Sequence, residues 1–574
     1  HLWTIKMHFF GGRAVHVLHK KLFMHRHFEI AFTRNASSLV KPLFMHASDY
    51  GSNIAIDDAY GEHSYLSILN RSRKLSNDLH RCLMKDSILG QRRIAVLCPN
   101  DIQYVISQWA VWMLGHIFVP LNKSSPSSQL EYFIKDSESS LVISSQCLAE
   151  KIQPLVDENK LCILDSKYLG PKFGDESIRA EYEMPDVNFY SNKSNLGLII
   201  YTSGTTGNPK GVMLSYFNIQ SHIECLLKSW GWTRNDYILH SLPLHHVHGI
   251  TNALLCPLTV GARCLLLPKF NATDVWNQLI SIKSKKVNIM MGVPTMYKML
   301  IDHYDKALSS SIRLKEFIKS ICSQTVRLMV SGSAPLPDPI FLRWQEITGH
   351  QLLERYGMTE IGMALSMPLQ GARQPGFVGV PLPNVHVRIS KKDPKQSYKT
   401  LVEGNQHGSH ILDPSETTGE LLVKGPNVFN GYYKREPETK STFTPDGWFI
   451  TGDTVTITNG WYKILGRSSV DIIKTGGYKV SALDVEKHIL GHPKISDAAV
   501  VGLPDITWGE KIIAIVVLHH NTQLELEELT KWCQKYLPAY SIPSGLKLVE
   551  QLPRNHMGKI NKKELKQMLL TKLI

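Results

Sequence analysis

Short apolar runs alternate with helical stretches along the chain, and this alternation constrains the fold most strongly. We expect strands at Arg93–Cys98 and His116–Leu121, with a helix between them at Ile102–Leu114. Two further apolar runs lie at Leu141–Ser144 and Leu161–Leu164. Strands that alternate with helices build parallel sheets through helical crossovers. The pattern therefore predicts an α/β fold with mostly parallel, βαβ-type sheets flanked by helices.

The length of the chain requires more than one domain. Its 574 residues are about four times a typical single domain. We place a large domain at residues 46–465 and a small α+β domain at residues 466–574, after a break near Gly466. Within the large domain, the polar stretch Lys391–Thr418 is interpreted as an inserted loop between β segments. The small domain has its own expected strands and helices: Ala498–Val501, Ile512–Leu518, Leu524–Tyr536 and Lys562–Leu573.

Composition excludes several classes of protein. Hydrophobic residues make up 43% and charged residues 20%, which is ordinary for a globular protein and excludes wholesale disorder. The net charge of +14 is spread along the chain without a recognised nucleic-acid module, so we expect no nucleic-acid partner. Nine cysteines without a C-x-x-C pair indicate reduced thiols and no zinc site. The apolar stretch Val111–Leu121 is too short to cross a bilayer, so we expect no transmembrane segment.

The N-terminal segment has the composition of a targeting sequence. Its first acidic residue is Glu29. Five basic residues precede it, interleaved with apolar ones: Lys6, Arg13, Lys20, Lys21 and Arg26. A basic, acid-poor, amphipathic leader is typical of a mitochondrial transit peptide, and an unstructured basic tail is the alternative. We therefore expect residues 1–45 to be a transit peptide and disordered leader, and the mature protein to lie in the mitochondrial matrix.

A glycine- and hydroxyl-rich loop follows the expected strand Leu196–Tyr201. Its ten residues are Thr202, Ser203, Gly204, Thr205, Thr206, Gly207, Asn208, Pro209, Lys210 and Gly211. Glycines let the backbone approach a ligand, while the hydroxyls and the lysine supply donors for phosphate oxygens. The spacing differs from the Walker A loop. Taken alone, such a turn could also be a flexible surface loop.

Together with this loop, six other segments resemble the motifs of the adenylate-forming superfamily, which contains acyl-CoA synthetases, luciferases and peptide-synthetase adenylation domains. In order, they are Ala110–Asn122, Pro243–Gly249, Glu354–Glu360, Trp448–Asp453, Gly466–Arg467 and Pro553–Ile560. The resemblance covers residues 50–574. It implies a large AMP-binding domain that includes a small β-barrel-like part, and a small mobile C-terminal domain that closes as a lid.

The resemblance also implies a reaction in two halves. A carboxylate attacks the α-phosphorus of ATP to give an acyl-adenylate, and the thiol of CoA then displaces AMP. The implied catalytic residues are Thr359, Glu360 and Lys559, with Mg²⁺ bound by Glu360. The implied ATP site consists of the loop Thr202–Gly211, Tyr356, Asp453, Arg467 and Lys559.

Between the halves, the small domain of such enzymes turns about a hinge. Relatives often have Asp or Lys two residues after Arg467, where this chain has Ser469, so the pivot residue stays open. The implied tunnel for CoA is formed by Thr475, Gly476, Gly477 and Tyr478. Two glycines there would let backbone lie against a narrow thiol arm.

The residues around the expected acid pocket are polar. His245, His246 and His248 lie in one motif, and Arg355 stands where many relatives have glycine. An additional cation suits a second carboxylate on the substrate. Our substrate-binding candidates are His246, His248, Arg327, Ser333 and Arg355. The alternative for Arg355 is a structural ion pair with Glu354 or another carboxylate.

Within the superfamily, the motifs resemble those of the mitochondrial malonate–CoA ligases. This implies malonate, or its relative methylmalonate, as the acid, with ATP and CoA as further small-molecule partners and a monomeric enzyme. A medium- or long-chain fatty acyl-CoA synthetase is the alternative within the class. A non-catalytic nucleotide-binding protein is disfavoured because Lys210, Glu360, Asp453 and Lys559 are all present.

Overall fold

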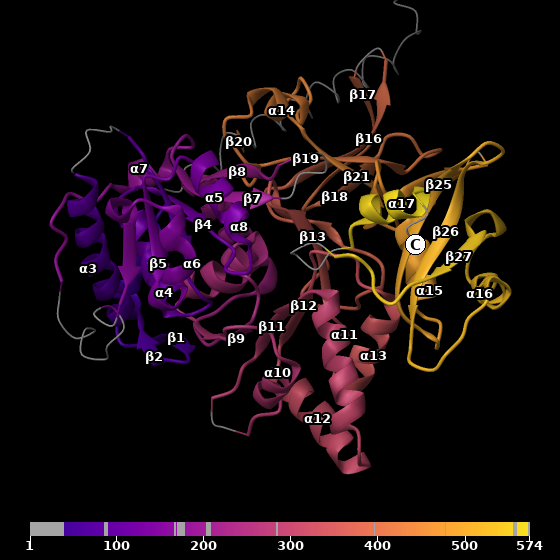
Figure 1. Ribbon diagram of the computed structural model, residues 1–574, viewed down its shortest axis with the longest axis horizontal. Coiled ribbons are helices and arrows are strands. Elements are labelled where there is room, and N and C mark those ends of the chain that lie inside the picture. The colour runs from indigo at the N-terminus through magenta and orange to yellow at the C-terminus, as the bar shows by residue number, and fades with distance from the viewer. Residues whose placement is uncertain are drawn as a thin grey trace, which may run out of the picture.

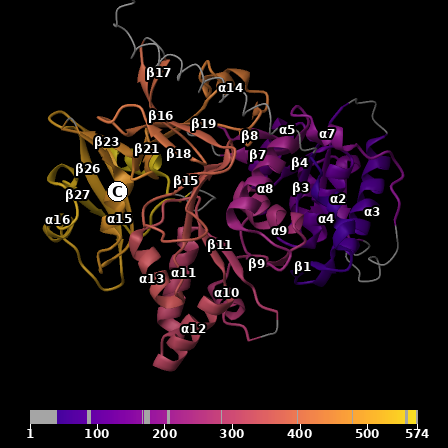
Figure 2. The same ribbon diagram turned by 180° about the vertical axis from the view of Figure 1, so that it is seen from behind.

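The computed structural model describes residues 40–84, 90–165, 168, 178–202, 208–282, 285–394, 397–476, 478–554 and 560–571. A large domain is built from three sheets, and the C-terminal part of the chain, drawn in yellow, forms a separate unit beside it (Figure 1). The view from behind shows the same division (Figure 2). The observed α/β architecture with a smaller second domain is the one expected from the sequence.

The first sheet carries the strand that leads into the phosphate loop. Within the described residues its order is β20-β8-β7-β4-β3-β5-β6, and the pairs from β7 to β6 are parallel. Its strands are β3 (Arg93–Leu97), β4 (Ile117–Pro120), β5 (Leu141–Ser145), β6 (Leu161–Leu164), β7 (Leu196–Thr202), β8 (Lys210–Ser215) and β20 (Gly431–Tyr432). The accompanying helices are α3 (Tyr65–Leu83), α4 (Ile102–Met113), α5 (Ser127–Asp136), α6 (Ala149–Ile152), α7 (Val187–Ser191) and α8 (Tyr216–Trp230). The strands and the helix expected here are confirmed.

The second sheet supplies the strands around the expected acid pocket. Its order is β15-β14-β13-β12-β11-β9-β10-β1-β2 among the described residues. The strands are β1 (Ile54–Asp58), β2 (Gly61–Ser64), β9 (Tyr237–His240), β10 (Arg263–Leu266), β11 (Ile289–Gly292), β12 (Leu328–Ser331), β13 (Leu353–Met358), β14 (Gly362–Ser366) and β15 (Val380–Pro381). The helices are α9 (Cys256–Thr259), α10 (Ala272–Leu279), α11 (Pro294–His303), α12 (Ile312–Thr325) and α13 (Asp338–Thr348). The six strands from β1 to β13 in this order run parallel, so their carboxyl ends share one edge.

The third sheet is antiparallel and forms the barrel-like part. Its strands are β16 (His386–Asp393), β17 (Ser397–Asn405), β18 (Gly408–Ile411), β19 (Thr418–Lys424), β21 (Phe449–Thr458) and β22 (Trp461–Arg467), with α14 (Glu436–Ser441) nearby. The loop expected at Lys391–Thr418 is wrong, because most of this stretch belongs to β16, β17 and β18. These outer strands expose many of their side chains, so a polar sequence there reports exposure rather than irregular backbone.

The small domain has its own sheet and core. It contains β23 (Ile472–Thr475), β24 (Tyr478–Ser481), β25 (Ile495–Asp505), β26 (Gly509–Leu518) and β27 (Gly545–Leu548). Its helices are α15 (Ala482–Ile489), α16 (Leu526–Cys533) and α17 (Lys562–Leu570), and Val485, Val500 and Leu529 are among its core residues. The chain changes sheets between Arg467 and Ile472, so the expected boundary at residues 465/466 falls inside β22.

The folded region begins before residue 46. Helix α2 (Leu43–Tyr50) buries Leu43 and Phe44, and the ring of Phe44 packs edge-on against Tyr190 at 6.0 Å. The backbone N–H of Val40 donates to the hydroxyl of Ser191 over 2.8 Å. Residues 40–45 are therefore part of the large domain, and their assignment to the leader is wrong; residues 1–39 lie outside the described residues. None of the helices in the described ranges is long and apolar enough to cross a membrane.

Candidate active site

A cleft of about 2010 Å³ lies where the large and small domains meet, and it collects residues from motifs that are far apart in sequence. The predicted residues that line it are Thr202, Lys210, His246, His248, Ser333, Arg355, Tyr356, Thr359, Glu360, Asp453 and Arg467. Thr202 is the last residue of β7, and Ser333 follows the end of β12. The carboxyl ends of parallel strands, where α/β proteins bind ligands, thus supply several of these side chains.

Asp453 is held from two sides at the expected ribose site. Its Oδ2 accepts a hydrogen bond of 2.5 Å from the Tyr356 hydroxyl, and its Oδ1 lies 3.0 Å from Nε of Arg467. Asp453 and Arg467 are also direct partners in the β21–β22 register. Burial, followed by the Asp453 carboxylate, raises the pKa of Tyr356 well above its usual value, so the hydroxyl stays a donor. A carboxylate fixed in this way can accept the two hydroxyls of a ribose.

Glu360 lies buried in the same cleft and is oriented by Tyr432. The Tyr432 hydroxyl donates to Oε1 of Glu360 over 2.9 Å, and the Lys210 ammonium lies 5.3 Å from the centroid of the Tyr432 ring. Burial raises the pKa of Glu360. Tyr432 is not among the residues predicted from the sequence. Its strand β20 pairs with β8, which begins at Lys210, and this pairing brings the ring beside Lys210. One oxygen donor here fits a Mg²⁺ ion that takes its other ligands from phosphates and water.

Arg355 is a buried cation without a carboxylate partner among the described residues. Arg355 lies in β13 and is 3% exposed. Burial lowers the pKa of its guanidinium to about 9. The alternative, an ion pair with Glu354, is not found among the described residues, and Oε1 of Glu354 accepts from the backbone N–H of Leu336 over 3.3 Å. A buried, uncompensated guanidinium is costly unless an anion binds to it. The position therefore favours a ligand role over a structural one.

Ser333 links Arg355 to His248. Nη2 of Arg355 donates to the Ser333 hydroxyl oxygen over 3.4 Å, and that oxygen lies 3.2 Å from Nδ1 of His248. A guanidinium only donates, so the Ser333 oxygen accepts from Arg355 and its proton is free to point to Nδ1; in that tautomer the imidazole carries its own proton on Nε2. Burial, followed by the charge of Arg355, lowers the pKa of His248 well below its usual value and keeps it neutral. Nε2 of His248 and Nε of Arg355 have no hydrogen-bond partner among the described residues, and both residues line the cleft.

Arg327 does not belong to this pocket. Its Nε and Nη2 bind the two carboxylate oxygens of Asp236, each over 2.7 Å, and its Nη1 donates to the carbonyl of Trp230. It precedes β12, whereas Ser333 follows it, and a four-residue strand separates the two ends by about 13 Å. The assignment of Arg327 to the substrate is therefore wrong. His246, by contrast, lines the cleft. The centroid of its ring lies 4.1 Å from the centroid of the His245 ring.

Several predicted residues lie outside the described residues, namely Ser203, Gly204, Thr205, Thr206, Gly207, Gly477 and Lys559. Of the phosphate loop, Asn208, Pro209 and Gly211 are also described, and the Pro209 carbonyl accepts from the Tyr132 hydroxyl over 2.8 Å.

Two described residues of the expected CoA segment lie beside exposed aromatic side chains. Tyr478 stacks on Tyr540 with ring centroids 4.1 Å apart. The backbone N–H of Gly476 donates to the carbonyl of Trp508, a residue that is 55% exposed. The sequence motif contains neither Trp508 nor Tyr540, which reach this surface from other parts of the small domain.

Comparisons with known proteins agree with this geometry. The AMP-binding enzyme family matches residues 43–433, and the AMP-binding enzyme C-terminal domain matches residues 484–559. The mitochondrial malonate–CoA ligases ACSF3 of Mus musculus and Homo sapiens are 47% and 48% identical to this chain. These alignments cover 92% and 91% of this chain and 90% and 91% of the relatives.

Solved structures of CoA ligases are also similar to this chain. ATP-bound MatB from Rhodopseudomonas palustris is 31% identical, with a TM-score of 0.77 over 92% of this chain and 98% of that one. A malonyl-CoA ligase in a ternary product complex with methylmalonyl-CoA and AMP is 28% identical, with a TM-score of 0.59 over 91% of this chain and 100% of that one. Because both domains match family models and the cleft between them collects the motif residues, the chain belongs to the AMP-binding enzyme family.

Proposed function

We propose that the protein is an ATP-dependent, AMP-forming acid–CoA ligase whose acid is malonate, with methylmalonate as a close alternative. The observation that carries this proposal is the buried Arg355 guanidinium, which has no carboxylate partner among the described residues. The names of the malonate–CoA ligases that it resembles support the same acid. A fatty acyl-CoA synthetase would bury an apolar chain in this pocket, and a buried cation would oppose that.

The acid pocket suits a dicarboxylate. The distal carboxylate accepts from Arg355 and from Nε2 of the neutral His248, while Ser333 fixes both donors. His246 completes the polar lining. Arg355 and Tyr356, which binds Asp453, both line the cleft, so a short acid held by Arg355 would have its other carboxylate directed to the nucleotide.

ATP occupies the remainder of the cleft. We assign the loop Thr202–Gly211, of which Thr202 and Lys210 line the cleft, to the phosphates, and Asp453 with Arg467 to the ribose. Thr359 donates to the α-phosphate, and Glu360 provides a carboxylate for Mg²⁺. The ion, when bound, neutralises phosphate charge during attack by the acid. Pyrophosphate leaves as the carboxylate oxygen bonds to the α-phosphorus.

The small domain serves the two halves of the reaction in turn. Lys559 neutralises charge during adenylation, and the segment Thr475–Tyr478 then guides the CoA thiol, whose attack on the acyl carbon releases AMP. The higher TM-score to ATP-bound MatB than to the product complex, 0.77 against 0.59, supports an adenylation-like arrangement here. We place the hinge in the turn between Arg467 and Ile472, where the chain changes sheets.

Residues 1–39 act as a mitochondrial transit peptide, and the enzyme works as a monomer in the matrix. The basic, acid-poor composition before Glu29 supports this location, as do the mitochondrial names of the relatives. Residues 40–467 then form the AMP-binding domain, and the remainder after the hinge forms the lid.

The proposal is tested by pyrophosphate release from ATP with a panel of acids, with and without CoA. Malonate should support the fastest release, and malonyl-CoA and AMP should form in equal amounts when CoA is present. A preference for octanoate over malonate would reject the dicarboxylate assignment. Release of orthophosphate and ADP instead of pyrophosphate and AMP would reject the adenylation chemistry.

A further inference from the structure

The small domain contacts the start of α13 through the C-terminal half of α15 and the residues after it. Nζ of Lys487 lies 2.6 Å from Oδ2 of Asp338, the first residue of α13. A Cβ atom on Gly491 would lie 3.6 Å from the Pro339 ring. A Cβ on Gly376 would lie 2.9 Å from the Lys487 ammonium, so a loop of the large domain also encloses it. The side chains of Lys487 and Asp338 are only 18% and 30% exposed.

Lys487 also brings positive charge to a second carboxyl group. Glu354 is buried, and its Oε2 has no hydrogen-bond partner among the described residues. The pKa of Glu354 is raised to about 8, chiefly by burial; the hydrogen bond from the Leu336 backbone lowers it, Asp338 raises it, and Lys487 lowers it. Lys487 thus pairs with the Asp338 carboxylate and also acts electrostatically on the buried Glu354.

The Lys487–Asp338 contact is present in the arrangement of the two domains that this structure shows. In this arrangement Ile560, Asn561 and Lys562 line the same cleft as Glu360 and Asp453. These three residues follow the expected catalytic lysine in sequence, and they line the cleft while Lys487 is paired with Asp338. The turn of the small domain proposed above for thiol transfer would move α15 relative to α13 and separate the pair.

We propose that Lys487 is a positioning residue for the adenylation half-reaction: by pairing with Asp338 beside Glu354, it docks the small domain in the arrangement that brings the C-terminal segment to ATP. Lys487 contacts neither ATP nor the acid in this role. The proposal rests on the proposed function, because it assigns the residue to one of its two half-reactions.

The test compares Lys487→Ala and Asp338→Asn with the wild type in two separate assays. Adenylation is measured as acid-dependent exchange of pyrophosphate into ATP, and thiol transfer as thioester formation from supplied malonyl-adenylate and CoA. Loss of a half-buried ion pair should slow the exchange by about three- to tenfold. The transfer should remain within about twofold of the wild type, because the pair is broken in that step.

A double variant sharpens the test. Lys487→Ala combined with Asp338→Asn should lose no more exchange activity than the worse single variant, because both changes remove the same contact. Exchanging the charges in Lys487→Asp with Asp338→Lys should recover part of the loss. Equal losses in both half-reactions, or additive losses in the double variant, would overturn the proposal.

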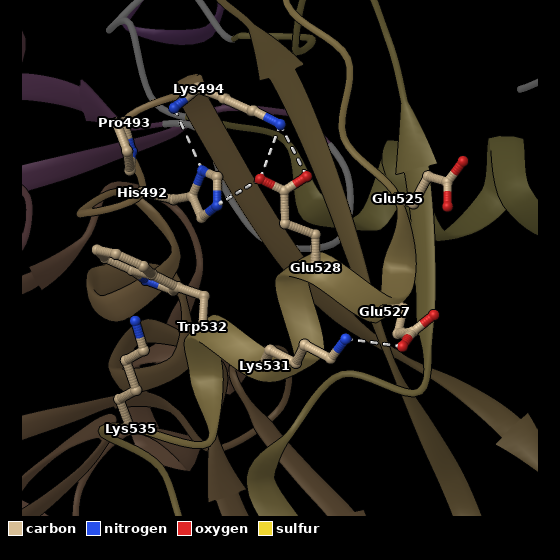
Figure 3. A pocket seen from close by; sticks show the side chains of 9 residues that line it. All are labelled: His492, Pro493, Lys494, Glu525, Glu527, Glu528, Lys531, Trp532 and Lys535. Atoms are coloured by element: carbon tan, nitrogen blue, oxygen red, sulfur yellow. Dashed lines mark hydrogen bonds and ion pairs between the residues drawn. The ribbon is translucent and has the colours of Figure 1, made fainter.

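Glu528 offers a matched control inside the small domain. Figure 3 shows its carboxylate between Lys494 and His492, and the distance to Nζ of Lys494 is 2.7 Å. Glu528→Gln removes an ion pair of similar length on α16, at the outer side of the small domain (Figure 1). Neither half-reaction should change by more than about twofold. The same selective loss of exchange in this variant would contradict the special role of Lys487.

The two proposals can fail separately. If the wild type supports exchange with another acid but not with malonate, the proposed substrate is wrong, and the Lys487 comparison is repeated with the adenylate of that acid. If malonate supports exchange and the Lys487 variants show no difference between the half-reactions, only the positioning role is rejected.

Discussion

Gly332 lies against the guanidinium of Arg355, so closely that a Cβ atom at position 332 would be 2.6 Å from both Cζ and Nε. Real Cβ atoms do not approach other heavy atoms to that distance, so a larger residue must displace the guanidinium. The glycine therefore gives Arg355 room to point along the end of β12 toward Ser333.

We predict that Gly332→Ala lowers kcat/KM for malonate by about ten- to a hundredfold, because small displacements of a charged contact are costly. The KM for ATP should change little, since the ribose contacts of Asp453 are separate. Steady-state kinetics with each substrate varied in turn measure both values. An unchanged kcat/KM for malonate would show that Arg355 does not bind the acid in this position.

Glu360→Gln tests the metal assignment. The variant keeps the shape and a Tyr432 contact but loses the negative charge, so Mg²⁺ should bind more weakly. We expect the Mg²⁺ concentration for half-maximal pyrophosphate release to rise at least about tenfold. A titration of the wild type and the variant with Mg²⁺ measures this shift. Identical titration curves would place the metal at another residue.

Glu354 should make the stability of the protein depend on pH. Its pKa is raised to about 8 in the folded protein, above the 4.5 of an exposed glutamate. The folded state therefore keeps a proton that the unfolded chain releases, and the free energy of unfolding from this group falls as pH rises from about 4.5 to about 8. Glu354→Gln should flatten the Tm profile across this range. A profile as steep as that of the wild type would assign the slope to other groups.

Truncation tests where the folded region begins. Removal of residues 1–39 should leave the Tm and the activity of the purified enzyme unchanged, whereas removal of residues 1–45 also deletes the buried Leu43 and Phe44. Each such side chain contributes about 1.5–3 kcal/mol when buried. The longer truncation should therefore lower the Tm clearly in thermal unfolding. Equal Tm values for both forms would place residues 40–45 outside the cooperative core.

Local sequence patterns predicted the strands and helices of the parallel sheets. The strand Leu161–Leu164 was placed to the residue, and the helix expected at Ile102–Leu114 ends one residue earlier, because apolar runs and turn residues mark these elements. The strands within Lys391–Thr418 were missed because their polarity reflects exposure. In the same way, composition did not place residues 40–45 in the folded region, which the contact of Phe44 with Tyr190 shows.

The candidate site shows the same limit. Arg327 and Arg355 both lie next to family motifs, and only the structure shows that one is neutralised by Asp236 and the other is not. Tyr432 and Lys487 carry no motif of their own. Their roles arise from contacts with Glu360 and Asp338, which are distant in sequence, so no local pattern could identify them.

The most direct measurement of the central claim is the acid specificity of Arg355→Ala. A desolvated charge pair of this kind contributes about 2–5 kcal/mol. The ratio of kcat/KM for malonate to that for butyrate should therefore fall by roughly 30- to 5,000-fold in the variant. Arg355→Lys, which keeps the charge but not the fork of donors, should lie between the variant and the wild type. An equal decrease for both acids, with an unchanged ratio, would contradict the account and make Arg355 a structural residue.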